Sequence, residues 1–341
     1  MPVMSAFRDG ARRVRGAPMM LLGLFAVTLL MALPLSYVLR TMIAAHLGAS
    51  LAANAAAAGA NYEWWQEFLS QASGLGKTFV PSIIGFGAVL DNLNGFLDNL
   101  PLASAILGIT AAWLIVWSFL SGGIVDRLAR GRRTRSHGFF AACGMHFWRL
   151  LRLGALAWLA YGFLFRYVHG WIFTGILARL THDVTVERTA FAYRVVAYLV
   201  FGILLVAVNV IFDFARIRLV VEDRRSAIGA LLAAGRFVRR HAAGVVGLYV
   251  LNALAFLLLI LIYALLAPGA PGGRLSSAAA LAIGEAYILA RLYLKLLFYA
   301  SETALFQGAL AHAAYTAAPA VVWPDSPAAE SIVNADRSPA S

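Results

Sequence analysis

The feature that most constrains this chain is a pair of apolar runs joined by a short basic segment. The first run ends at Asp213, the second extends from Gly244 to Leu266, and seven arginines lie between them in residues 216–240. Each run is long enough for an α-helix that crosses the hydrocarbon core of a bilayer, which takes about 20 residues. Basic connections between such helices stay in the cytoplasm. The sequence therefore predicts a hairpin of two membrane helices with a cytoplasmic connection.

Composition extends this interpretation to the whole chain. Of the 341 residues, 61% are hydrophobic and the mean hydropathy is +0.77, whereas soluble domains are about 45–50% apolar. The net charge of +12 does not indicate a nucleic-acid partner, because the basic residues flank the apolar runs. There they are typical of topology signals and of contacts with anionic lipid.

The predicted fold is all-α, an integral membrane bundle of about six transmembrane helices with amphipathic interfacial helices. We expect a single transmembrane domain over residues 1–315, with a helical insert outside the membrane over 41–100 and a disordered cytoplasmic tail over 316–341. The glycines at 122 and 123 are expected to end the second span. The six expected spans cover residues 18–39, 102–121, 150–172, 195–212, 244–266 and 277–302.

The distribution of lysine and arginine predicts the orientation. The segments assigned to the inside hold 18 of these residues, and those assigned to the outside hold seven. By the positive-inside rule both termini are cytoplasmic, and the expected location is the inner membrane of a bacterium. The two most basic stretches, residues 127–152 and 216–240, are expected to contact anionic phospholipid.

One part of the sequence resembles a known group. The run DFARIRLVVEDRRSAIGALLAAGRFVRRHAAGVVGLYVL, which begins at Asp213, and the later ARLYLKLLFYASETALFQ resemble uncharacterised bacterial polytopic membrane proteins. Within that group they are similar to the membrane domain found beside glycerophosphoryl diester phosphodiesterases. The resemblance covers the second half of the chain. It implies a helical membrane fold, and it implies no catalytic residue.

Motifs of reaction chemistry are absent from the sequence. It contains no GxxxxGK[ST], no HExxH and no GxSG, and its seven histidines include no pair at helical spacing. The single cysteine, Cys143, lies among alanine and glycine and is expected to be a packed thiol. We therefore predict no enzyme, no cofactor, no metal site and no catalytic residue.

Polar residues within the later apolar runs are the candidate site. Asp213, like Asp126, has an arginine a few residues away and is expected to form a local ion pair. At about 100° per residue, Arg291, Lys295 and Glu302 share one stripe of the last span. Arg291 is expected to pair with Asp213 or Asn209 on another helix. The candidate polar or ligand-binding residues are Asn209, Asp213, Arg216, Asn252, Arg291, Lys295 and Glu302.

Two functions follow from these features. The first is a non-enzymatic membrane protein that contacts anionic lipid or a membrane partner at its cytoplasmic face. The alternative is a transporter or permease whose polar path is lined by the fourth to sixth spans. A charged, water-filled cavity that reaches the middle of the membrane would favour the alternative.

Overall fold

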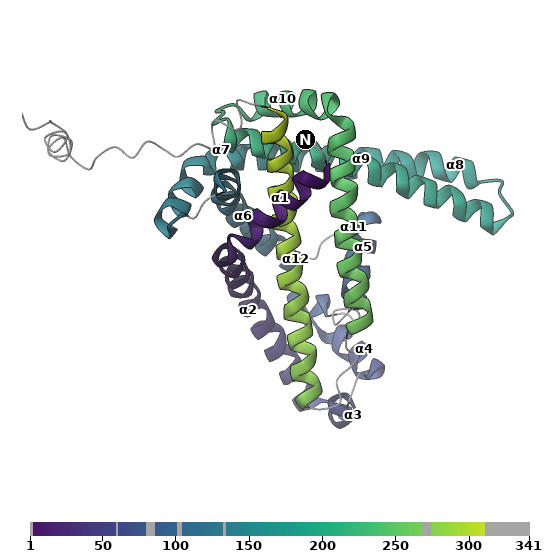
Figure 1. The fold of residues 1–341 in the computed structure, drawn as a ribbon. Coiled ribbons are helices and arrows are strands. Elements are labelled where there is room, and N and C mark those ends of the chain that lie inside the picture. The colour runs from purple at the N-terminus through teal and green to yellow at the C-terminus, as the bar shows by residue number, and fades with distance from the viewer. Residues whose placement is uncertain are drawn as a thin grey trace, which may run out of the picture.

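The regular secondary structure of the protein is helical throughout the residues that the computed structural model describes, which are 3–58, 61–79, 86–100, 104–131, 134–267 and 274–310 (Figure 1). The expected tail over 316–341 lies outside them. The helices are α1 (Val3–Arg15), α2 (Pro18–Ala49), α3 (Ala53–Ala58), α4 (Tyr62–Gln71), η1 (Gly74–Thr78), α5 (Phe86–Leu97), α6 (Ser104–Arg130), α7 (Ser136–Phe163), η3 (Leu164–His169), η4 (Trp171–Leu177), α8 (Ala178–Thr181), α9 (Glu187–Val221), α10 (Ala227–Arg240), α11 (Ala242–Leu266) and α12 (Arg274–Ala309).

Four of these helices are long and apolar enough to cross a membrane. They are α2, α6 from Ile106, α9 and α11. These four helices indicate an integral membrane protein and coincide with four of the six predicted spans. The other two predicted spans, residues 150–172 and 277–302, lie in α7 with the π-helical turns η3 and η4, and in α12.

The end that the sequence predicts for the second span is wrong. Gly122 and Gly123 do not end the helix, because α6 continues to Arg130. A Cβ atom at Gly123 would lie 2.5 Å from the sulfur of Cys143 and 2.8 Å from the carbonyl oxygen of Phe139. The glycines therefore allow α7 to pack closely against α6. Cys143 itself is fully buried there, as expected.

The first span is also longer than the sequence predicts. Pro34 lies inside α2, which continues to Ala49, so that the insert begins at about residue 50 instead of 41. Residues 41–49 contain good helix formers and no residue that stops a helix. The insert is helical in α3, α4, η1 and α5. Its α4 buries Trp64 and Phe68, and the Trp64 indole donates to His46 of α2.

Residues 164–205 form an antiparallel hairpin, here called the arm, from η3, η4, α8 and the first part of α9. Phe201, Leu164 and Ile172 are buried within it, and its surface exposes Trp171, Phe191 and other large apolar side chains. In Figure 1 the arm extends to the side, whereas α11 and α12 run along the length of the molecule. Its apolar surface is suited to lipid.

The basic N-terminus is a helix with one buried face and not only a flank of the first span. In α1 the buried residues are Ala6, Gly10 and Val14, spaced four apart. This narrow face lies against α12, and Figure 1 shows α1 crossing that helix. Because small residues at this spacing leave room for a second backbone, α1 becomes part of the bundle.

Candidate functional site

Asp213 is the centre of the largest group of polar side chains inside the bundle. One of its carboxylate oxygens accepts hydrogen bonds from Asn209 Nδ2 at 2.7 Å and from the Tyr249 hydroxyl at 2.6 Å. The other accepts from Arg216 at 2.8 Å. Arg216 also donates to the Tyr299 hydroxyl at 2.5 Å. We call Asn209, Asp213, Arg216, Tyr249 and Tyr299 the charged centre.

The charged centre joins four helices. Asn209, Asp213 and Arg216 follow one another at spacings of four and three on α9, so that one helix face carries all three. Tyr249 reaches them from α11, Tyr299 from α12, and Tyr161 of α7 donates to the amide oxygen of Asn209. A buried carboxylate with this many donors is well compensated. The expected local pairing of Asp213 is confirmed, as is that of Asp126, which pairs with Arg130.

The partner that the sequence predicts for Arg291 is wrong. Arg291 is exposed, and the arginine that pairs with Asp213 is Arg216. The physical reason is distance along the chain: Arg216 lies one turn from Asp213 on the same helix and needs no other element to place it. Of the stripe predicted on the last span, only Lys295 and Glu302 are turned into the protein.

Lys295 lies beside the charged centre without joining it. Its ammonium group is 3.4 Å from the centre of the Trp117 ring, a cation–π contact. The Trp117 indole donates to the Tyr299 hydroxyl at 3.3 Å. Trp117 of α6 thus connects Lys295 to the charged centre.

Glu302 and Asn252 are buried with incomplete hydrogen bonding. Asn252 donates to the Ser301 hydroxyl at 3.0 Å, but its own oxygen accepts no hydrogen bond from the part of the chain that the structure describes. Glu302 is 0% exposed, and neither of its oxygens has a hydrogen-bond partner among the described residues. Its electrostatic neighbours are Asp213, Tyr249 and Arg216. All seven candidate residues except Arg291 therefore lie close together, with Asp213, Asn252 and Glu302 buried and Asn209 exposed.

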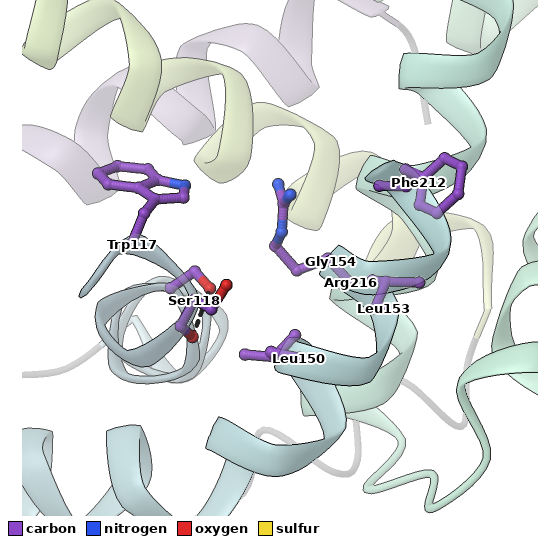
Figure 2. A pocket seen from close by; sticks show the side chains of 9 residues that line it. Trp117, Ser118, Leu150, Leu153, Gly154, Phe212 and Arg216 are labelled. Carbon is purple, nitrogen blue, oxygen red and sulfur yellow. Dashed lines mark hydrogen bonds between the residues drawn. The ribbon is translucent and has the colours of Figure 1, made fainter. Parts of the chain in front are cut away.

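A small cavity borders the charged centre between α6, α7 and α9. Figure 2 shows Arg216 reaching from α9 toward α12, with the Trp117 indole facing it from α6. The volume of the cavity is about 40 Å³. Since one water needs about 10–15 Å³ measured in this way, the cavity accommodates a few waters but no organic substrate. It is lined by Trp117, Ser118, Ser121, Leu150, Leu153, Gly154, Ala157, Phe212 and Arg216.

A second polar cluster connects α1 to the ends of α6 and α12. Arg13 pairs with Asp9 and donates to Gln307 at 2.7 Å and to the Leu128 carbonyl at 2.9 Å. Gln307 in turn donates to the Ala129 carbonyl at 3.1 Å. Arg13 was predicted only as a topology signal. The sequence does contain a signal for this role. The small residues Ala6 and Gly10 give α1 a face that can be buried, and Arg13 lies beside that face.

Comparison with protein-family models, with curated proteins and with solved structures finds no match to this chain. The class of protein is therefore defined by the fold and the site. It is a helical membrane protein with a charged centre inside its bundle. Within the described residues, no group of three His, Cys, Asp or Glu side chains is placed to hold a metal ion.

Proposed function

We propose that this is a non-enzymatic integral membrane protein of the bacterial inner membrane that binds anionic phospholipid at its cytoplasmic face. The observation that carries the proposal is the outer face of α10. Ile228 and Leu232 are 61% and 65% exposed there, and Arg236 and Arg239 are exposed within about 80° of them around the helix. Aliphatic side chains beside arginines suit the boundary between acyl chains and phosphate groups.

The buried face of α10 determines which of its side chains point outward. Ala227, Ala230, Ala234 and Phe237 are buried against the bundle, and the Ser226 hydroxyl caps the helix by accepting from the Gly229 amide. α7 has a similar outer face, on which Trp148 is 65% exposed and Arg152 is also exposed. Two helices at one end of the molecule thus present aromatic or aliphatic groups together with arginine.

The lipid preference can be measured by native mass spectrometry of the purified protein mixed with phosphatidylglycerol and phosphatidylcholine. The natural protein is expected to retain phosphatidylglycerol preferentially. Changing Arg236, Arg239 and Arg240 to glutamine should weaken this retention by up to about fivefold per charge, because each charge contributes about 1 kcal/mol.

The matched control removes three exposed arginines of the arm, Arg179, Arg188 and Arg194. This variant should retain the lipid as the natural protein does, since the positions lie on the side assigned to the outside. Equal retention of the two lipids by the natural protein would contradict the proposal, and so would equal losses in both triple variants.

The proposed topology has six spans, which adds α7 with its π-helical turns and α12 to the four long apolar helices, and both termini are cytoplasmic. It requires the arm, which extends sideways from α11 and α12 in Figure 1, to cross the membrane as well. The excess of positive charge in the segments assigned to the inside supports it. Reporter fusions test it at six positions. Cytoplasmic signals are expected after Arg135, Arg225 and Ala320, and external signals after Leu75, Thr185 and Pro271. A cytoplasmic signal after Thr185 would contradict six spans and would place the arm along the membrane surface.

A transporter or permease is the second candidate, with a path along α9, α11 and α12. The carboxyl group of Glu302 favours this function, because it is buried and has no hydrogen-bond partner among the described residues. Ionisable groups inside membrane bundles are typical of ion and proton pathways. The cavity of about 40 Å³ is far below the 300–1,000 Å³ typical of sites for organic ligands. Transport of a small ion or a proton fits this interior better than transport of an organic solute.

A further inference from the structure

Glu302 is the buried polar group that the proposed function leaves unexplained. It is 0% exposed, and no described residue donates a hydrogen bond to either of its carboxyl oxygens. An ionised carboxylate in an apolar interior is very costly unless it is paired. Glu302 therefore either has a cation beside it or is neutral.

The cations near Glu302 are already engaged elsewhere. Arg216 donates to the Asp213 carboxylate and to the Tyr299 hydroxyl. Lys295 lies on the Trp117 ring, about 10 Å from Glu302 along α12 at 1.5 Å per residue. Arg13 of α1 forms an ion pair with Asp9 and donates a hydrogen bond to Gln307, which lies five residues after Glu302 on α12. Arg127 of α6 donates to the Gly16 carbonyl.

The Tyr249 hydroxyl is the group that relates Glu302 to Asp213. It donates to Asp213 at 2.6 Å, and it lies one turn along α11 from Asn252, which bonds to Ser301, the residue next to Glu302 on α12. A phenol has one hydrogen to donate, and here it is directed to Asp213. Toward Glu302 the hydroxyl oxygen can only accept, so a hydrogen bond between them needs a proton on Glu302.

We propose that Glu302, Tyr249 and Asp213 form a proton-binding site, in which Glu302 holds the proton and its hydroxyl donates to the Tyr249 oxygen. The Tyr249 hydroxyl then donates to Asp213, so that the three groups form one hydrogen-bonded chain. The ligand is a proton and not a metal ion, because within the described residues no group of three His, Cys, Asp or Glu side chains is placed to hold a metal. Asp213 keeps its pairing with Arg216.

The hydrogen bonds from Glu302 to Tyr249 and from Tyr249 to Asp213 also define how the proton can move. If Glu302 gives its proton to the Tyr249 oxygen while Tyr249 gives its own to Asp213, one O–H bond forms for each one that breaks. The negative charge then moves from Asp213 to Glu302, and the Arg216 guanidinium loses its ionic partner. The position of one proton is thereby coupled to the contact between α9 and α12.

Infrared spectroscopy of the purified protein in a carbonyl-free detergent tests the site at neutral pH. The natural protein should show the C=O band of a protonated carboxyl group, which shifts in D₂O, and Glu302→Gln should remove it. Glu187→Gln, at an exposed position, is the control and should keep it. Loss of an ionised-carboxylate band in Glu302→Gln, with the protonated region unchanged, would overturn the proposal.

Tyr249→Phe gives a second spectrum that does not depend on the folding of Glu302→Gln. Because Glu302 then lacks its acceptor, the band should persist at a shifted frequency. Absence of any protonated-carboxyl band from the natural protein would also overturn the proposal, as would an unshifted band in Tyr249→Phe.

The pH dependence of unfolding gives an independent proton count. A free glutamate is ionised above about pH 4.3, so unfolding at neutral pH releases the proton that folded Glu302 holds. Stability should fall as the pH rises from about 5, with the unfolding equilibrium constant increasing about tenfold per pH unit relative to Glu302→Gln. Glu187→Gln should follow the natural protein. Parallel curves for the natural protein and Glu302→Gln would contradict a proton on Glu302.

Discussion

Replacing Gly10 by alanine is expected to separate α1 from α12. A Cβ atom at Gly10 would lie 2.6 Å from the backbone nitrogen of Ser301 and 2.7 Å from its Cα atom. Backbone atoms cannot turn away as a side chain can, so one helix must move. We expect a loss of about 1–3 kcal/mol in the free energy of unfolding, the range of overpacked cores. Thermal unfolding in detergent measures this loss, and proteolysis within residues 3–15 should become faster.

Gly23→Ala is the matched control, because a Cβ atom at Gly23 has no neighbour within 4 Å. Alanine favours helix over glycine, so this variant should be as stable as the natural protein or slightly more stable. Equal stability of Gly10→Ala and Gly23→Ala would show that α1 is not packed against α12 as described.

Removing the carboxylate at the charged centre is expected to be the most damaging single change. Asp213→Ala leaves the Arg216 charge without its ionic partner and removes the acceptor of the Tyr249 hydroxyl, whereas Asn209 keeps its bond to Tyr249 at 3.2 Å. Breaking a buried pair in this way costs about 3–5 kcal/mol. Equilibrium unfolding in detergent, followed by circular dichroism, measures the loss.

Two further variants test whether the loss of stability comes from the ion pair of Asp213 with Arg216. Asp213→Ala combined with Arg216→Met should recover part of the stability, because an apolar pair can replace a buried ion pair. Arg291→Gln should change the stability by no more than about 0.5 kcal/mol, the usual range for surface positions. A larger loss in Arg291→Gln than in Asp213→Ala would restore Arg291 as the partner of Asp213.

Contacts within one helix were predictable from spacing, and contacts between helices were not. The pairs of Asp213 with Arg216 and of Asp126 with Arg130 follow from positions three and four apart. Tyr249 and Tyr299 approach Asp213 from other helices, and nothing in their local sequence distinguishes them from other aromatic residues of membrane helices. Their role in the charged centre therefore became visible only in the folded chain.

The same limit applies to the glycines and to α1. Gly122 and Gly123 are consistent with a helix end as well as with a close helix contact, and only the approach of α7 distinguishes the two. The arginines of α1 satisfy the positive-inside rule whether or not the helix is buried. Most helix positions were predictable from apolar runs, whereas their packing depends on residues far apart in the chain.

The contact of α1 with α12 also determines when α1 can pack during synthesis of the protein. Arg13 and Gln307, which bond to each other, are 294 positions apart, so α1 is synthesised well before α12, the helix against which it packs. Until α12 is synthesised, Gly10 lacks the backbone of Ser301 against which it packs, and α1 cannot reach its final position. Closure of such a long loop is slow compared with local pairing. Insertion of α12 is therefore the step that allows this packing, and a chain truncated before α12 would expose α1 to cellular proteases.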